Sequence, residues 1–362
     1  MSDQLAERDV QMAQVFFGGP DKPRGLLRNL LAERVDAVPK GGEILWATYY
    51  FRDIDLAEAL VRAKRRGVTI KVCIEASPRL RAANQLVQKQ LVSLNVRDTD
   101  FRSVTHLLPS HIHEKIYMFS HPSPVAFVGS FNPSGCSLED AEAVREIGDQ
   151  DAGHNYLVEI ADPVIVDALR RHVRWLVNSP HGILERYAPD ANETPRSGEM
   201  SIFFFPRRDS AVVPKLLGEH RYDCIRIAAS HFRDRSIAEV LARLADSGTS
   251  VEVIAHHTKR RVPDRIELLT EHAGIRFNRY QHPRDLPMHS KFILLTAGRF
   301  RRVIFGSMNL THTSRWLNHE VLVDSRESGL VDAFNQRWEH MLSEINAFQG
   351  GVGASNGLGE AS

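Results

Sequence analysis

The 362-residue sequence has little cysteine, almost no net charge and no long apolar run. Its three cysteines, Cys73, Cys136 and Cys224, cannot pair evenly, so we expect reduced thiols in a cytoplasmic protein. Lys and Arg number 46 against 45 Asp and Glu, which argues against a bulk nucleic-acid coat but not against a local basic cleft. No apolar run approaches the roughly 18 residues of a membrane-spanning helix, and the polar, acidic start is unlike a signal peptide.

What the sequence does contain is an internal repeat. Residues 44–74 and 225–255 are related by an offset of 181 positions and are identical at eleven of 31 positions. Each copy predicts a βαβ unit: an apolar strand, an Asp that caps a helix, a Gly that ends it, and a second strand. The predicted elements are strands at 44–50 and 225–230, helices at 56–65 and 237–246, and strands at 68–74 and 249–255, with Asp53 and Asp234 as N-caps and Gly67 and Gly248 after the helices.

The similarity continues on both sides of this unit. Strand-then-helix patterns match between 15–31 and 202–217 and between 154–169 and 319–334. The sequence therefore predicts two homologous halves, each with a largely parallel sheet under helical cover. The boundaries we expect are 10–178 and 199–345 for the halves, 179–198 for a polar linker, and 346–362 for a disordered Gly/Ser-rich tail.

A polar motif occurs once in each half. It reads H-x-K, then thirteen or fourteen residues, then G-S-x-N, and comprises His113, Lys115, Ser130 and Asn132 in the first half and His289, Lys291, Ser307 and Asn309 in the second. Because residues i and i+2 of a strand share a face, each half should present an imidazole, an ammonium, a hydroxyl and a carboxamide on one surface. That set suits a tetrahedral oxyanion, with donors for its oxygens and a histidine for attack or proton transfer.

The doubled motif resembles that of the phospholipase D superfamily, and the resemblance covers nearly the whole chain. It implies an α/β fold of two homologous α-β-α repeats, each a mixed, mostly parallel sheet with helices on both faces, packed with pseudo-twofold symmetry around one site. One histidine would attack phosphorus to form a phosphohistidine, and the other would protonate the leaving oxygen and then activate water or an alcohol. No metal or cofactor is implied, and the lysines and asparagines would stabilise the phosphoryl oxygens.

The sequence departs from the family pattern at two kinds of position. The Asp of H-x-K-x4-D is replaced by Ser120 and Thr296, and the acid expected after G-S-x-N is Glu320 in the second half but Asn155 in the first. A carboxylate on Nδ1 fixes the tautomer of an imidazole and raises its basicity. By the cross-half pairing of the relatives, Glu320 would support His113 as nucleophile, and His289 near Asn155 would be the acid/base. The predicted catalytic residues are thus His113, His289, Lys115, Lys291 and Glu320, and the predicted substrate-binding residues are Ser130, Asn132, Ser307, Asn309 and Asn155.

Other residues have plainer readings. A metal site at His111, His154 or His319 is disfavoured because no Cys or acidic ligand framework accompanies them. Tyr50 and His231 hold matched positions and either line the pocket or pack at strand ends. The apolar run 203–205 favours a buried strand, although peripheral membrane contact stays open.

The sequence is compatible with three functions. The first is a phosphodiesterase or phosphatidyltransferase acting on a phospholipid or small phosphodiester. The second is a nuclease or DNA-end-processing enzyme, and the third is a catalytically inactive binding protein. Basic runs at 64–66, 259–261 and 299–302 would favour the nuclease if they surround the motifs, whereas an apolar rim would favour a lipid. One chain suffices to build the site, because it carries both motifs.

Overall fold

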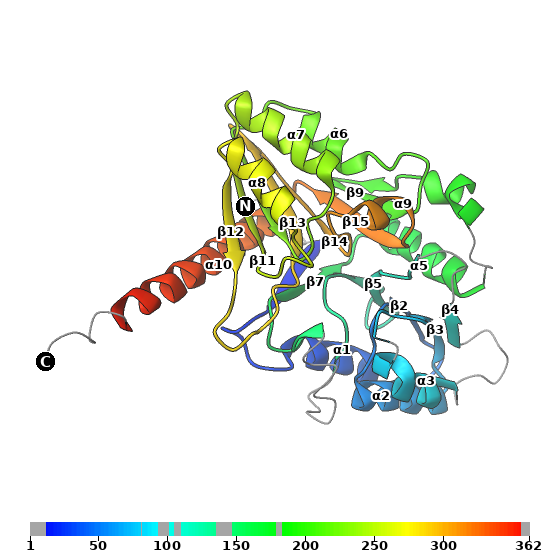
Figure 1. Ribbon diagram of the computed structural model, residues 1–362. Coiled ribbons are helices and arrows are strands. Elements are labelled where there is room, and N and C mark those ends of the chain that lie inside the picture. The colour runs from blue at the N-terminus through cyan, green and yellow to red at the C-terminus, as the bar shows by residue number, and fades with distance from the viewer. Residues whose placement is uncertain are drawn as a thin grey trace, which may run out of the picture.

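The computed structural model describes residues 12–80, 82–92, 101–104, 110–134, 147–178 and 183–355, without the side chains of 183, 185, 190 and 350–355. These residues form two α/β halves that pack against each other (Figure 1). Cys73 and Cys224 form no disulfide, and Cys136 lies outside the described residues. None of the described helices combines the length and the apolar character that crossing a bilayer requires.

The first half is built on a seven-stranded mixed sheet in the order β1-β7-β6-β5-β2-β3-β4. Its strands are β1 (Ala13–Gly18), β2 (Glu43–Thr48), β3 (Thr69–Glu75), β4 (Phe101–Val104), β5 (Lys115–Phe119), β6 (Val125–Gly129) and β7 (Asn155–Ile160). Its helices are α1 (Leu26–Ala37), α2 (Ile54–Arg65), α3 (Ala82–Val92) and α5 (Pro163–Asn178).

The second half repeats this topology with one added strand, in the order β12-β11-β10-β13-β14-β15-β9-β8. Its strands are β8 (Arg196–Ser197), β9 (Met200–Phe205), β10 (Cys224–Ala229), β11 (Ser250–His256), β12 (Arg276–Tyr280), β13 (Lys291–Ala297), β14 (Phe300–Gly306) and β15 (Glu320–Ser325). Its helices are α6 (Val212–Gly218), α7 (Arg235–Asp246), α8 (Asp264–His272), α9 (His312–Trp316) and α10 (Ser328–Ser355). Short 3-10 turns at Ile183–Tyr187 and Asp190–Asn192 lie between the halves in sequence.

The predicted βαβ units are confirmed. β2 pairs in parallel with β3, and β10 with β11, around helices α2 and α7. Asp53 accepts the Leu56 N–H and Asp234 accepts the Ile237 N–H, so both act as N-caps. Gly67 and Gly248 follow the helices at φ 91° and 96°, a conformation in which a side chain would be strained.

The mixed sheets with helical cover are also confirmed, but the expectation that each is mostly parallel needs correction. Parallel pairing is confined to β2-β3-β4 and β10-β11-β12. The other neighbours of the two central sheets pair antiparallel. In β5–β6 and β13–β14 this is because each H-x-K strand turns back directly into its G-S-x-N strand as a hairpin. The predicted end of the second repeat at 345 falls inside α10, which continues to Ser355.

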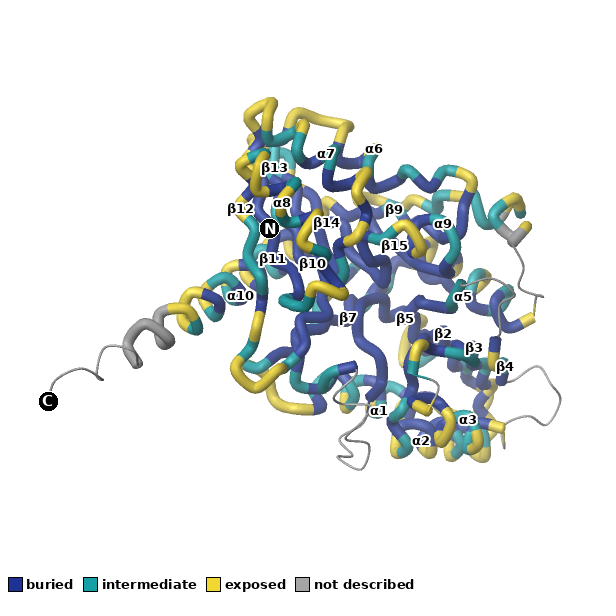
Figure 2. Tube along the Cα trace, viewed as in Figure 1, coloured by how far each residue is buried: buried dark blue, intermediate teal, exposed yellow. Residues whose placement is uncertain are grey.

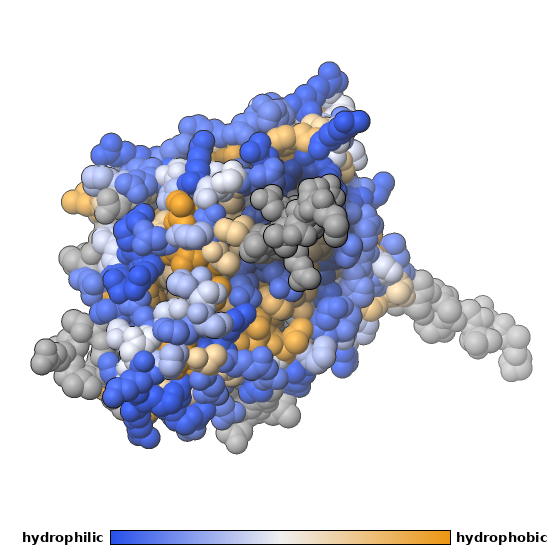
Figure 3. All heavy atoms as spheres, turned by 180° about the vertical axis from the view of Figure 1, so that it is seen from behind, coloured by the Kyte–Doolittle hydropathy of each residue, from blue (hydrophilic) through white to orange (hydrophobic). Residues whose placement is uncertain are grey.

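Three apolar clusters hold these layers together. One fills the outer face of the first sheet under α1, α2 and α3, and another fills the outer face of the second sheet under α6, α7 and α8. The third lies between the halves and includes side chains of both sheets, α5 and α10. The strands are correspondingly buried and the outer helix faces exposed (Figure 2). From behind, hydrophilic residues border smaller apolar areas (Figure 3).

β9 contributes to two of these clusters, with Phe204 in the one between the halves and Phe203 and Phe205 in the outer one of the second half. The run 203–205, predicted as a buried strand, is the end of β9 and is buried there. Across the interface, the Tyr156 hydroxyl donates to the Lys291 carbonyl oxygen at 2.6 Å and accepts the Gly306 N–H at 2.9 Å. Because buried backbone groups need partners, this one hydroxyl links β7 of the first half to both motif strands of the second.

Candidate active site

The two motifs meet at the contact between the halves, through duplicated backbone hydrogen bonds. The His113 N–H donates to the His319 carbonyl at 2.9 Å, and the His289 N–H donates to the His154 carbonyl at 2.9 Å. Each motif histidine is therefore held by the residue that precedes the last strand of the opposite half. This exchange brings residues 206 and 135 positions apart in the sequence together in one site.

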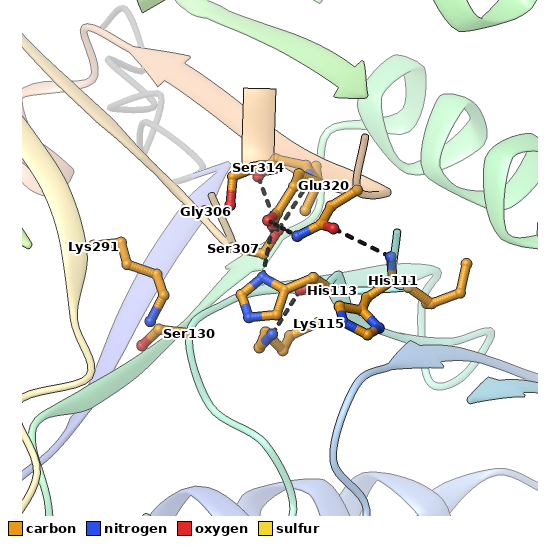
Figure 4. A network of polar contacts seen from close by, with 12 residues as sticks. His111, His113, Lys115, Ser130, Lys291, Gly306, Ser307, Ser314 and Glu320 are labelled. Carbon is orange, nitrogen blue, oxygen red and sulfur yellow. Dashed lines mark hydrogen bonds and ion pairs between the residues drawn. The ribbon is translucent and has the colours of Figure 1, made fainter. Parts of the chain in front are cut away.

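His113 is backed by a carboxylate (Figure 4). Its Nδ1 lies 2.9 Å from Oε2 of Glu320, at the start of β15. The Ser307 hydroxyl donates to the same oxygen at 2.6 Å, and Asn318 donates to Oε1 at 3.3 Å. Burial alone would raise the pKa of Glu320, but His113, Lys115 and the Ser307 hydrogen bond hold it below its ordinary value. An ionised Glu320 fixes the Nδ1–H tautomer of His113 and leaves its Nε2 free to act.

His289 occupies the matching place with a neutral support. Its Nδ1 lies 3.0 Å from the Asn155 Oδ1 and 3.0 Å from the Ser130 carbonyl oxygen. Because the Ser130 carbonyl oxygen can only accept, Nδ1 carries a hydrogen. The Ser130 hydroxyl donates to Asn155 at 3.3 Å, as Ser307 does to Glu320. The halves thus share one scaffold and differ by a carboxylate against an amide.

Burial keeps both imidazoles neutral. It lowers the pKa of His113 to about 4 despite Glu320, and it lowers the pKa of His289 well below the ordinary value with help from Lys291 and Lys115. The negative charge of a phosphate in the cleft would offset the positive charge of Lys115 and Lys291 and so raise the pKa of both histidines. Proton uptake by a histidine is therefore coupled to the arrival of an anion.

The motif lysines lie behind the histidines. Lys115 Nζ donates to the His113 carbonyl at 2.6 Å and lies 5.6 Å from the centre of the Tyr49 ring, and Lys291 Nζ donates likewise to the His289 carbonyl. Burial lowers the pKa of Lys115 to about 7, and burial with Lys115 and Arg261 lowers the pKa of Lys291 well below its ordinary value. These groups can supply positive charge beside a bound anion, which in turn favours their charged forms.

A cleft of about 540 Å³ opens over the two histidines. Of the predicted residues, His113, His289, Asn132 and Asn309 line it. The Asn309 Oδ1 is buried without a hydrogen-bond partner among the described residues, and the Asn132 Oδ1 accepts the Tyr50 N–H at 3.4 Å.

The other predicted residues stand outside that lining. Ser130, Ser307 and Asn155, predicted as substrate contacts, are fully buried, with their side chains in the hydrogen bonds that support the histidines. Glu320 likewise lies behind His113. In this structure their side chains support the histidines and do not line the cleft.

Several cleft residues escaped the sequence reasoning. Tyr49 lies with its ring centre 5.1 Å from that of His113, and Arg79, Arg233 and Arg265 reach the cleft from loops after strands or the start of a helix. Tyr50 and His231, which the repeat placed at equivalent positions, both line it. Their shared place just after β2 and β10 was the available signal, because ligands of α/β sheets bind beyond the carboxyl ends of the strands.

The flanking histidines and the replaced Asp have structural surroundings. His154 is buried between Glu344 at 2.7 Å and Tyr280 at 2.8 Å. The Ser120 hydroxyl accepts the Glu43 N–H at 2.7 Å and so ties β5 to β2. No three His, Cys, Asp or Glu side chains in the described ranges are grouped so that they could hold a metal ion.

Two α/β repeats that meet at a doubled H-x-K…G-S-x-N motif define the class of two-repeat phospholipase D-like proteins. The chain belongs to the family described as cardiolipin synthase, PLD-like domain, which it matches over residues 41–176 and 219–342. Proteins of this superfamily act on phosphodiesters. None of the curated proteins searched matches the sequence.

Solved structures share the fold at low sequence identity. Phosphatidylserine synthase of Haemophilus influenzae Rd KW20 superposes with a TM-score of 0.66 and 14% identity, covering 91% of this chain and 86% of that one. Polyphosphate kinase of Porphyromonas gingivalis superposes with a TM-score of 0.64 and 15% identity over 91% of this chain. The chain spans 50% of that kinase. At identities of 14 and 15%, both likenesses concern the fold alone.

Proposed function

We propose that the protein cleaves or transfers a phosphodiester through a covalent phosphohistidine on His113, with His289 as acid and base. The observation that carries this assignment is the unequal support of two otherwise matched imidazoles. His113 is bound to a carboxylate, whereas His289 is bound to an amide and a carbonyl. Positive charge on an imidazole that bonds to phosphorus is stabilised by the carboxylate, so His113 is the better nucleophile.

The first step forms the phosphohistidine. The Nε2 lone pair of His113 attacks phosphorus, and the bond from phosphorus to the leaving oxygen breaks. His289, protonated when the anion binds, gives its Nε2 proton to that oxygen. The neighbouring ammonium groups of Lys115 and Lys291 and the amide of Asn309 offset charge on the phosphoryl oxygens.

The second step releases the phosphoryl group. Neutral His289 removes a proton from water or an alcohol, whose oxygen attacks phosphorus. The phosphorus–nitrogen bond breaks and its electron pair returns to Nε2 of His113. Atoms and charge balance with residues of this chain alone, so we propose that no metal takes part.

Trapping tests the assignment. With a ³²P-phosphodiester whose leaving group is 4-nitrophenolate, which departs without an acid, His289→Ala should accumulate labelled enzyme because dephosphorylation lacks its base. His113→Ala should acquire no label. His220→Ala, an exposed histidine outside the cleft, is the matched control. Label on the His113→Ala protein, or none on the His289→Ala protein while the wild type turns over, would refute the roles.

A nucleic-acid strand is the second candidate substrate beside a phospholipid, and one observation favours it. Five arginines line the cleft, namely Arg79, Arg233, Arg260, Arg261 and Arg265, whereas Ile147 is the one aliphatic residue among the described lining residues. Two residues of the basic run 259–261, Arg260 and Arg261, therefore reach the site, where their guanidinium groups can bind phosphates of a polyanion.

Assays with labelled single- and double-stranded DNA, RNA and phosphatidylcholine, each with EDTA present, separate these substrates. Activity abolished by chelation would contradict a mechanism without metal. Binding without any turnover, unchanged in His113→Ala, would support the inactive binding protein instead.

A further inference from the structure

The two walls of the cleft differ in chemistry although the repeat relates them. At the offset of 181, the matched pairs are Tyr49 with Ser230, Tyr50 with His231, Arg79 with Arg260 and Leu80 with Arg261. In the first half, Leu80 packs against a small cluster that includes Tyr49, Tyr50 and Ile147. In the second half, the equivalent place holds a guanidinium. The two repeats therefore differ at the site, where the second half has a cation in place of an apolar side chain.

Arg261 is the unusual member of this wall. Its side chain lines the cleft, yet the residue is only 7% exposed. Its contacts are long hydrogen bonds of 3.4 Å to the Ser230 hydroxyl and 3.5 Å to the Ile147 carbonyl, and it forms no ion pair with a described carboxylate. Burial and the neighbouring Arg260 lower its pKa to about 10, so it remains charged at neutral pH.

Of the other four buried arginines in the described ranges, three have acidic partners, namely Arg302, Arg315 and Arg337. The fourth, Arg207, instead donates to the Asn192 carbonyl oxygen and the Thr194 hydroxyl, at 3.1 Å each. Arg337 lies 2.8 Å from Asp21, and Arg315 lies 2.7 Å from Asp234. A buried charge without a partner is costly to the folded protein. A buried guanidinium in the wall of a cleft, without an acidic partner from the described residues, can be stabilised by a bound anion.

The surroundings of Arg261 extend this positive wall. Arg233 and Arg265 line the same cleft and are exposed, and the described lining residues include no carboxylate. Arg261 donates to the Ser230 hydroxyl, and the Ser230 N–H donates to the carbonyl oxygen of Ser290, the neighbour of His289, at 3.1 Å. The charge of Arg261 also helps to lower the pKa of His289. The positive wall therefore belongs to the side of the proposed acid/base rather than of the nucleophile.

We propose that Arg261, with Arg233 and Arg265, forms a second phosphate-binding subsite beside His289. The preferred substrate then carries a further phosphate on the group that leaves when His113 attacks. This proposal rests on the proposed function for its sidedness, but the binding of two neighbouring phosphates does not depend on turnover.

Three dinucleotides test the sidedness: TpT, and its isomers with one added phosphate at the 5′ or the 3′ end. Wild type should cleave one of the two isomers with a kcat/KM about 10- to 100-fold above TpT, the range of a charged hydrogen bond. Arg261→Leu, which installs the residue of the other half, should abolish that preference. Arg65→Leu, an exposed arginine on α2 outside the cleft, should retain it. Equal rates for both isomers, or an equal loss on all three substrates in Arg261→Leu, would overturn the subsite.

A binding measurement separates this proposal from the mechanism. In the His113→Ala protein, inorganic pyrophosphate should bind about tenfold more tightly than orthophosphate, and adding Arg261→Leu should remove the difference. Arg265→Leu, at an exposed position, should weaken pyrophosphate in the same direction if Arg261→Leu does not fold. Pyrophosphate selectivity without turnover of any dinucleotide would uphold the subsite and count against the phosphodiesterase. Turnover of the dinucleotides with no preference for either isomer and no preference for pyrophosphate would support the phosphodiesterase and refute the subsite.

Discussion

Glu320→Gln removes one charge from the carboxylate that backs His113 and keeps the shape of the side chain. The amide oxygen can still accept from His113 Nδ1 and from the Ser307 hydroxyl, which both bond to Oε2 in the native site. The amide nitrogen then faces the Asn318 side chain, which donates to Oε1 at 3.3 Å in the native site, so that one hydrogen bond is lost. The main change is electrostatic.

The size of the effect follows from the geometry. Nδ1 and Oε2 are 2.9 Å apart, which puts the centres of charge roughly 4 Å apart once the imidazole becomes positive on bonding to phosphorus. At an effective dielectric constant of about 20, that attraction is about 4 kcal/mol. A neutral hydrogen bond retains about 1 kcal/mol of it. The difference of about 3 kcal/mol predicts a phosphorylation rate about 100-fold slower.

Rapid-quench measurement of phosphoenzyme formation in a single turnover tests this prediction, because it isolates the step in which His113 becomes charged. Glu344→Gln is the matched control: it neutralises the carboxylate 2.7 Å from another buried histidine, His154, outside the cleft. The control should form phosphoenzyme at nearly the native rate. A loss below about threefold in Glu320→Gln would refute the role of the carboxylate, since it corresponds to less than about 0.7 kcal/mol.

Three further predictions concern stability and are measured by urea unfolding. The free energy of unfolding should fall as the pH drops from about 6.5 towards 4, because burial lowers the pKa of His113 and His154 to about 4 and the unfolded chain then binds more protons than the folded one; a flat profile in that window would contradict the buried neutral histidines. Gly306→Ala should cost about 2 kcal/mol or more, because a Cβ there would lie 2.2 Å from the Val321 carbonyl oxygen at φ 147°, whereas Gly298→Ala, in open space at φ 56°, should cost less; equal losses would show that backbone conformation alone decides. Tyr156→Phe should cost about 1–3 kcal/mol by leaving the Gly306 N–H unpaired, and a neutral result would mean that another group replaces the hydroxyl.

Local patterns made much of the fold predictable. The strands, the helices and the caps at Asp53 and Asp234 depend on neighbours within a few residues, and the structure confirms them. The relative direction of the strands was harder to predict. A βαβ unit suggests parallel pairing, but the strands of the two motif hairpins pair antiparallel with each other and with β2 or β10. Strand direction depends on connections, which short patterns describe only in part.

The site divides in the same way. The motif names its histidines, and the family pattern names Glu320 and Asn155 as their supports. It does not show that the Ser130 and Ser307 hydroxyls turn away from the cleft, because that depends on contacts with β7 and β15 made in the folded chain. Nor does it reveal the positive wall. Arg261 stands out only when it is compared with Leu80, its equivalent in the repeat, and when its lack of a described acidic partner is known.

Duplication within one chain explains why these differences matter. Two identical halves would give each histidine the same support and the same neighbours, so that either could attack and a substrate could bind in two directions. Here Glu320 supports His113 whereas Asn155 supports His289, and Arg261 in the wall of the cleft corresponds to Leu80 in the other repeat. The first difference assigns different chemistry to the two imidazoles, and the second gives the substrate one direction. Because Arg261 lies on the side of His289, both differences select the same leaving group. Replacing Arg261 should therefore abolish the preference for one end of the substrate as leaving group, whereas replacing Glu320 should change how fast that group leaves.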